Sequence, residues 1–126
     1  MHRINYFAIP ADVPDRAMKF YQQVFGWRFD VGWEHETQQG REKFWHVNTG
    51  EGAGIDGGMT RREYPGQPIS VGIKVPAVDS CTDLVEKCGG KTLVPKVGIP
   101  GVAWFAVCQD SEGNTFAIMQ SDPTAR

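Results

Sequence analysis

The sequence has few cysteines, no long apolar run and almost no excess of charge. The cysteines are odd in number and none stands in a C-x-x-C pair, which argues against a disulfide framework and for a reducing compartment; they are Cys81, Cys88 and Cys108. No apolar run approaches the ~20 residues that span a bilayer, and Met1–Tyr6 lacks the apolar stretch of a signal peptide. A net charge of −2 and a pI near 5.9 provide no positive electrostatic field that would attract nucleic acid or an anionic membrane. We therefore expect a cytoplasmic protein without nucleic-acid or membrane partners.

The remaining composition is that of an ordinary globular domain. The chain has 126 residues, of which 40% are hydrophobic and 22% charged. This length supplies the core of one domain, which we expect to cover residues 1–126.

The stretch from Val102 to Gln120 carries the clearest pattern. Two alternating apolar runs, Val102–Val107 and Thr115–Met119, flank the polar connection Asp110–Asn114. The connection contains a glycine and an asparagine, which tolerate positive φ, so a tight reversal is favoured there. The pattern predicts a β-hairpin with one face for helices and one face for a pocket.

A strand followed by a helix is predicted at the start of the chain. Ile4–Ile9 alternates, so that Phe7 and Ile9 face one side of a sheet while Tyr6 and Ala8 face the other. Apolar residues then recur at helical spacing, with Asp12 as the expected N-cap and Gly26 as the C-terminal cap; they are Ala17, Phe20, Tyr21, Val24 and Phe25.

The rest of the first half predicts three more strands. Trp27–Trp33 and Lys43–Asn48 are separated by a polar loop, Glu34–Glu42, and a short glycine-rich strand ends near Thr60. In the middle one of these strands, Phe44 and His46 share one face, and Trp45 and Val47 share the other. The proline-containing connector Arg61–Pro68 is the expected linker.

The second half repeats this order. A strand at Ile69–Val75 leads to a helix at Val78–Cys88, and Lys91–Val94 forms a strand before the connector Pro95–Gly101 and the hairpin. Ile9-Pro10-Ala11 before the first helix matches Val75-Pro76-Ala77 before the second. The sequence thus predicts an α+β fold of two strand–helix–three-strand modules, at about residues 1–60 and 69–122, with a linker at about 61–68.

One such module is too small to bury both faces of its sheet. We expect the helix to cover one face and a mostly apolar trough to form at the other. Small residues leave room in that trough, namely Ala8, Ser70, Gly72 and Ala117, and larger ones wall it, namely Tyr6, Trp45, Met59 and Trp104.

Four segments carry a resemblance to a known family. They are IPADVPDRAMKFYQQVFGW up to Trp27, GAGIDGGM at Gly52–Met59, VPAVDSCTDLVEKCGGK at Val75–Lys91 and CQDSEGNTFAIMQSD at Cys108–Asp122. In this order and spacing, the chain resembles the vicinal oxygen chelate superfamily of glyoxalase I, bleomycin-resistance proteins and extradiol dioxygenases. The last segment departs from the family pattern, because Ser111 replaces a proline. The resemblance implies two βαβββ modules whose curved mixed sheets surround a central trough.

The resemblance also implies positions for a divalent metal. Enzymes of the family hold it with a His or Gln on the first strand and a Glu on the last strand of each half. These positions correspond to Tyr6, the stretch Gly57–Met59, Ser70 and Ala117. Because these side chains cannot form a His/Glu cage, we expect no metal cofactor here.

The leading hypothesis is therefore a protein that binds a small, largely apolar or aromatic molecule in the trough, as bleomycin-resistance members do. The expected ligand-binding residues are Tyr6, Trp45, Met59, Ser70, Trp104, Cys108 and Ala117. The alternative is a glyoxalase-like lyase or isomerase, or a dioxygenase. It would use a divalent metal at an unusual site with His46 and Asp56, or acid–base chemistry at Tyr6. A third possibility is a partner-binding module whose trough is filled by its own side chains. The resemblance also implies a homodimer.

Each candidate has a structural alternative. Tyr6, Trp45 and Trp104 also suit core packing, and Cys108 also suits the place of a small buried apolar residue. For the histidines, the alternatives are a core or surface position for His46, a charged loop for His35 and a mobile terminus for His2. Arg61 and Lys96 can either meet an anionic substrate or lie solvated at the surface. Cys81 and Cys88 are expected on the buried face of the second helix.

Overall fold

The computed structural model describes residues 2–37 and 40–126, without the side chains of residues 33, 35–37 and 40–42. The chain divides into two compact units. The N-terminal unit is Tyr6–Ile69. The C-terminal unit joins residues 2–5 to Ser70–Arg126. The cut between these units falls inside the first strand.

The N-terminal unit contains one helix and a mixed sheet. The strand order is β2-β3-β4-β1, with β1 and β4 parallel and the other pairs antiparallel. The elements are β1 (Ile4–Ala11), α1 (Pro14–Phe25), β2 (Arg28–Thr37), β3 (Gly40–Asn48) and β4 (Gly57–Arg61). The expected alternation of β1 and β3 is confirmed, since Ile9, Ala11 and Val47 are buried together with Met59 in the core under α1.

Aromatic rings complete the core under α1. The Tyr21 and Trp27 rings stack with centroids 5.1 Å apart, and the Phe7 ring lies 5.6 Å from that of Trp27. Offset rings at such distances add to the free energy of burying their apolar surface. α1 ends as predicted at Gly26, whose φ of 74° a residue with a side chain adopts only with strain.

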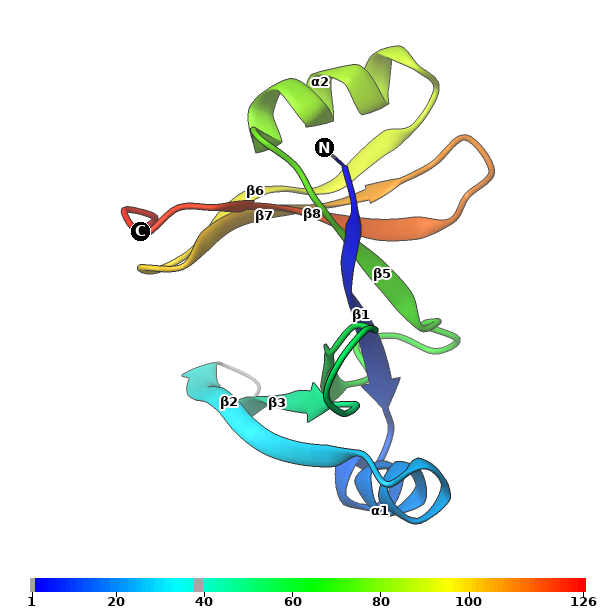
Figure 1. The fold of residues 1–126 in the computed structure, drawn as a ribbon. Coiled ribbons are helices and arrows are strands. Elements are labelled where there is room, and N and C mark those ends of the chain that lie inside the picture. The colour runs from blue at the N-terminus through cyan, green and yellow to red at the C-terminus, as the bar shows by residue number, and fades with distance from the viewer. Residues whose placement is uncertain (1, 38–39) are drawn as a thin grey trace. The chain divides into compact units, whose positions relative to one another are not determined.

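The C-terminal unit repeats the plan. Its strands lie in the order β5-β8-β7-β6, with β5 and β8 parallel and the others antiparallel. The elements are β5 (Ser70–Lys74), α2 (Val78–Lys87), β6 (Lys91–Ile99), β7 (Ala103–Gln109) and β8 (Thr115–Ser121). Figure 1 shows α2 lying over one face of β6, β7 and β8. Together the two units confirm the α+β fold of two βαβββ modules.

An aliphatic core lies under α2. It consists of Val75, Val78, Ala106, Cys108 and Ile118, against which Ile73, Cys81, Val85, Trp104 and Phe116 pack. The predicted hairpin is confirmed by the pairing of β7 with β8. Its turn is fixed by Asp110, whose Oδ1 accepts hydrogen bonds from the backbone N–H groups of Glu112 and Asn114 at 2.8 and 2.9 Å.

Two predicted loops are strands instead. Most of Glu34–Glu42 belongs to β2 and β3, whose antiparallel pairing extends to Thr37 and Gly40. Polar residues do not prevent such pairing, because both faces of a two-stranded ribbon can be exposed to water at its end. An ion pair also joins the two strands, since the Lys43 ammonium lies 3.7 Å from the Glu34 carboxylate. Most of Pro95–Gly101 belongs to β6, an edge strand. Its ladder is irregular between Val94 and Val97, which accommodates Pro95.

Two expectations about side chains are also wrong. The N-cap of α1 is Val13, without a side-chain cap, because the Asp12 carboxylate instead accepts a hydrogen bond from Arg62 Nε at 2.8 Å. Cys88 is exposed at the end of α2, whereas Cys81 packs against the core as expected. Helical spacing selected Cys88, but the helix ends at Lys87, before that residue could be buried.

Candidate functional site

The face of the N-terminal sheet opposite α1 carries several polar groups close together. His46 pairs with Gly58, and Gly58 pairs with Ala8, so these positions form one row across β3, β4 and β1. Their neighbours Ile9, Val47 and Met59 point into the core under α1. Because side chains alternate along a strand, His46 and Ala8 lie on the opposite, helix-free face. We call this surface the polar face.

Tyr6 belongs to the polar face by the same alternation, since its neighbour Phe7 packs into the core under α1. The Tyr6 side chain is half-buried, and this burial raises the pKa of its phenol. The phenol therefore stays protonated around neutral pH, a form that can donate a hydrogen bond.

Asp56 directly precedes β4 and is held by one residue. Its Oδ1 accepts hydrogen bonds from the Thr49 backbone N–H at 2.9 Å and from the Thr49 hydroxyl at 3.1 Å. The backbone hydrogen bond from Thr49 is the main cause that lowers the pKa of Asp56, and the charge of nearby His46 lowers it further. Asp56 is therefore an oriented, ionised carboxylate within electrostatic reach of the exposed His46 imidazole.

Two other predicted ligand-binding residues of this unit lie on the helix side. Met59 is fully buried in the core under α1, and Trp45 packs against the same core. Their placement supports the packing alternative that the sequence left open. A ligand-binding role for either stays a prediction.

In the C-terminal unit, Ser70 and Ala117 lie on the helix-free face. Ala117 pairs with Gly72, and its neighbours Phe116 and Ile118 belong to the core under α2. Ser70 lies two residues before Gly72 and thus shares its face. Both side chains are half-buried, and a contact of either with a ligand stays a prediction.

Trp104 and Cys108 lie on the α2 side. The Trp104 indole N–H donates to Asp122 Oδ2 at 2.9 Å, and the Lys96 ammonium lies 4.7 Å from the centre of its ring. Lys96 also forms an ion pair with Asp79 at 2.9 Å. Cys108 is fully buried in the core, and this burial raises the pKa of its thiol. Both residues have structural partners, and their ligand-binding role stays a prediction.

The positions that the resemblance assigns to metal ligands do not fit a divalent cation. They hold a phenol, a hydroxyl, a methyl group and the Gly57–Met59 stretch, whose one large side chain is turned into the core. Within residues 2–37 and 40–126, as far as side chains are described, no three His, Cys, Asp or Glu residues are grouped closely enough to hold a metal ion. His46 and Asp56 alone supply only two donors.

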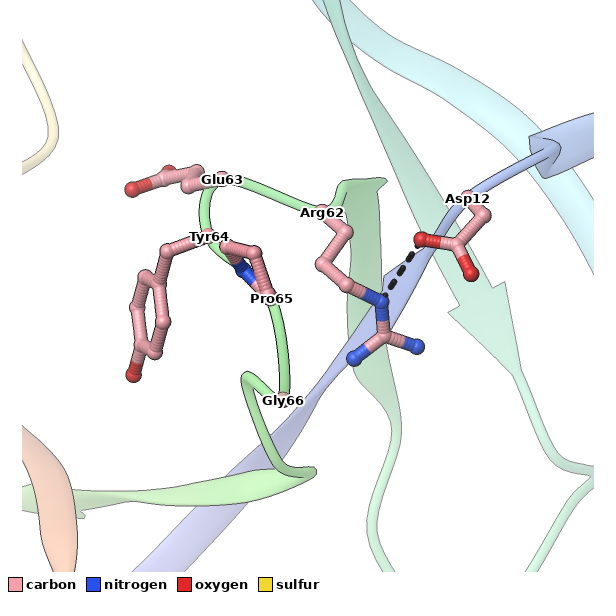
Figure 2. Close-up of a pocket in the computed structure, with 6 residues that line it drawn as sticks. All are labelled: Asp12, Arg62, Glu63, Tyr64, Pro65 and Gly66. Carbon is pink, nitrogen blue, oxygen red and sulfur yellow. Dashed lines mark hydrogen bonds and ion pairs between the residues drawn. The ribbon is translucent and has the colours of Figure 1, made fainter.

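A shallow hollow of about 550 Å³ lies beside the end of β4, lined by Asp12, Arg62, Glu63, Tyr64, Pro65 and Gly66. Figure 2 shows the Arg62 and Asp12 side chains pointing toward each other, while the Tyr64 ring projects from the other part of the loop. Arg62 also donates to the Gln67 carbonyl, and Arg61 donates to the Asp12 carbonyl at 3.4 Å. These contacts give both arginines a structural role in closing the loop.

The two remaining histidines are described to different degrees. His2 is an exposed residue ahead of β1, and the side chain of His35 lies outside the described residues. Sequence reasoning did not select Asp30, which pairs with His46 across β2 and β3, or use Phe44, whose ring lies over Gly58. Phe44 could have been predicted to lie on this face, because it stands two residues before His46 in the same strand.

The family follows from a match that spans nearly the whole chain. Residues 3–118 match the model of the Glyoxalase/Bleomycin resistance protein/Dioxygenase superfamily. The chain belongs to this superfamily. It is 30% identical over 118 residues to a glyoxylase-like domain-containing protein of Didymella fabae, covering 92% of this chain and 91% of that protein.

Solved structures share the fold of this superfamily member. A hypothetical protein from Bacillus halodurans C-125 has a TM-score of 0.68 at 12% identity, covering 99% of this chain and 98% of that one. A methylmalonyl-CoA epimerase from Mycobacterium tuberculosis has a TM-score of 0.68 at 11% identity, covering 95% and 88%. At such identities the likeness extends to the fold and not to the reaction. No helix in the described part of the chain is both long and apolar enough to cross a membrane.

Proposed function

We propose that this superfamily member binds a small, largely apolar or aromatic molecule on the helix-free faces of its sheets and holds it without a metal. The observation that carries the proposal is the set of side chains at the family's metal positions, where Tyr6, Ser70 and Ala117 replace cation ligands. The same faces carry small residues next to aromatic ones, such as Ala8 and Gly58 beside Phe44. Shape and apolar contact, with a few polar groups for orientation, are the usual means of binding such molecules.

A substitution that fills the face tests this proposal. Ala8→Phe places a ring on the helix-free face, so we expect it to weaken binding of an apolar fluorescent dye, such as anilinonaphthalene sulfonate, and its displacement by small aromatic compounds. Ala53→Phe adds the same ring to an exposed loop and is the matched control. Unchanged dye binding in a folded Ala8→Phe variant would contradict a site on this face. One-to-one binding of Ni, Zn, Fe or Mn in equilibrium dialysis, at micromolar affinity or better, would contradict metal-free binding.

The second candidate is a glyoxalase-like lyase or isomerase, or a dioxygenase. The oriented Asp56 carboxylate near His46 favours acid–base chemistry on the polar face. Turnover of a hemithioacetal or a catechol would support it. Loss of that activity in Tyr6→Phe would assign the acid, and loss on addition of EDTA would point to a metal at His46 and Asp56. The homodimer and the cytoplasmic location stay predictions from the sequence; light scattering after gel filtration measures the former.

A further inference from the structure

The helix α1 carries more apolar surface than its own sheet covers. Val13, Phe20 and Val24 are 46, 54 and 55% exposed. Together with the half-buried Ala17 they form a row along the helix, which we call the α1 stripe. We propose that the α1 stripe is an interaction surface, and that it packs in antiparallel orientation against the α1 stripe of a second copy of this chain.

The spacing of the α1 stripe is that of a helix–helix contact. Its members follow one another after four, three and four residues, which at about 100° per residue keeps them within about 60° of arc. An alternation of three and four residues defines the seam between two helices packed side by side. The Ala17 backbone N–H donates to the Val13 carbonyl at 3.0 Å, so Val13 stands one turn before Ala17 at the start of this row.

The core under α1 lies on another side of the helix. Pro14 is buried, and Met18 and Tyr21 pack against the core, about a quarter turn away from the α1 stripe. The Phe20 ring meets the Tyr21 ring edge-on, with centroids 5.2 Å apart, and this contact orients the exposed ring. A partner can therefore cover the α1 stripe without displacing the core.

The polar side chains of α1 occupy a third side of the helix and leave the stripe free of charge. They are Asp15, Arg16, Lys19, Gln22 and Gln23.

A second copy is the partner that this row fits. When two stripes lie antiparallel with matched ends, Val13 faces the partner's Val24, and Ala17 faces the partner's Phe20. Each aromatic ring then fills the space beside a methyl group, so large and small side chains alternate along the seam. A parallel pair would instead set ring against ring and methyl against methyl, which leaves a bulge and a gap.

The electrostatics agree with the antiparallel arrangement. Arg16 at the border of the stripe lies toward the partner's Gln23, so no like charges meet there. The arrangement also brings the positive N-terminal end of each helix dipole close to the negative C-terminal end of the other. Because the same surface is used twice, the contact closes on itself and yields a dimer.

The length of α1 sets the expected strength of the dimer. The helix has 12 residues and is thus about 18 Å long. A seam of this length is small compared with the interfaces of permanent complexes. We therefore expect a reversible dimer with a dissociation constant in the micromolar range.

Light scattering after gel filtration, over a range of protein concentrations, tests the inference. The wild-type protein should pass from monomer to dimer as its concentration rises. Phe20→Glu places a charge near the centre of the seam in both copies, so it should raise the dissociation constant about a hundredfold. Leu84→Glu, at a position 58% exposed on α2, is the matched control and should leave the constant unchanged. Circular dichroism checks that both variants are folded.

A pair of opposite charges tests the orientation of the helices. Val13→Lys and Val24→Glu should each raise the dissociation constant about tenfold. The double variant should recover most of this loss, because the antiparallel arrangement sets the new ammonium against the new carboxylate at both ends of the seam. A double variant that dimerises no better than the single variants would show that the helices are not antiparallel.

Two further results would overturn the inference. One is a wild-type protein that stays monomeric up to millimolar concentration. The other is a dimer that survives Phe20→Glu, in which case the homodimer expected from the sequence uses a different surface. None of these results affects the proposed function, because the dye experiment with Ala8→Phe examines the helix-free face.

Discussion

The two units share one plan of strands and helix but differ in what their helix-free faces carry. In the N-terminal unit this face holds Tyr6, His46 and Asp56, with Asp30 beside them. In the C-terminal unit the corresponding positions on β5, β7 and β8 are mostly apolar or small, with Lys74 as the one ionisable side chain; they include Ser70, Gly72, Phe105, Val107, Ala117 and Met119. On the strands compared, the two units thus share their packing rules, while the helix-free face of the N-terminal unit carries more ionisable side chains.

The hydrophobic cores of the two units also differ in composition. Under α1 the buried side chains are supplemented by aromatic rings, and under α2 they are mostly aliphatic. Rings fill a large volume with few side chains, which suits the N-terminal sheet, because two adjacent positions of β4 are glycines. At Gly57 the Phe7 ring occupies the space that a side chain would take.

The largest effect is expected from emptying either core. Met59→Ala and Ile118→Ala each remove a side chain that is at most 1% exposed, which should lower the free energy of unfolding by about 2–5 kcal/mol. Urea unfolding followed by circular dichroism measures the loss, and Leu84→Ala, at a position 58% exposed on α2, is the control. A core variant that left stability unchanged would contradict the packing of that side chain in its core.

A smaller loss is expected from adding a methyl group at Gly58, on the polar face. Gly58→Ala puts a Cβ atom into the Phe44 ring, which should cost about 1–3 kcal/mol. The cause is steric and not conformational, since Gly58 is absent from the glycines of positive φ. Thermal unfolding of Gly58→Ala, Phe44→Ala and the double variant measures the coupling between the two positions. We expect Gly58→Ala to lower the stability less in the Phe44→Ala background, where the ring is absent.

The smallest effects concern two carboxylates, one in each unit. Hydrogen bonds from Thr49 lower the pKa of Asp56, and those from Asn114 and Glu112 lower the pKa of Asp110. A lowered folded-state pKa contributes stability above the unfolded value of about 3.9, and this contribution is lost as the pH falls through the folded value. Asp56→Asn and Asp110→Asn should therefore each reduce the loss of melting temperature between about pH 5 and about pH 2.

Both groups are close to the surface, so each change should be modest compared with the core variants. Glu51→Gln, at an exposed position of the loop before β4, is the control. If the melting temperatures of both variants followed the wild-type dependence on pH, neither carboxylate would have a lowered pKa in the folded protein.

The fold could be predicted from the sequence because local patterns agreed with one another. The alternation of Phe7 and Ile9 against Tyr6 and Ala8, the cap at Gly26 and the turn at Asp110–Asn114 each depend on a few adjacent residues. The strand ends in Glu34–Glu42 and Pro95–Gly101 could not be predicted, because pairing with a neighbouring strand outweighed the polar and proline-containing local sequence.

The candidate site was harder to predict for the same reason. Alternation correctly separated Trp104 and Cys108 from Phe105 and Val107, but it does not say which of the two sets faces the helix. Only the pairing of three strands with a helix on one side places Trp45, Met59, Trp104 and Cys108 in the cores. The closeness of Asp56 to His46 depends on the loop between them, whose shape no local pattern encodes.

The division of the chain inside β1 has a consequence for anyone who dissects this protein. The Lys74 backbone N–H donates to the Arg3 carbonyl at 2.9 Å, so the opening residues serve a unit whose other members begin at Ser70. A fragment made by cutting at the connector would leave that amide without its partner, and adding back a short synthetic peptide of the first residues should restore the missing edge. The C-terminal unit is consequently built from two separate stretches of the chain.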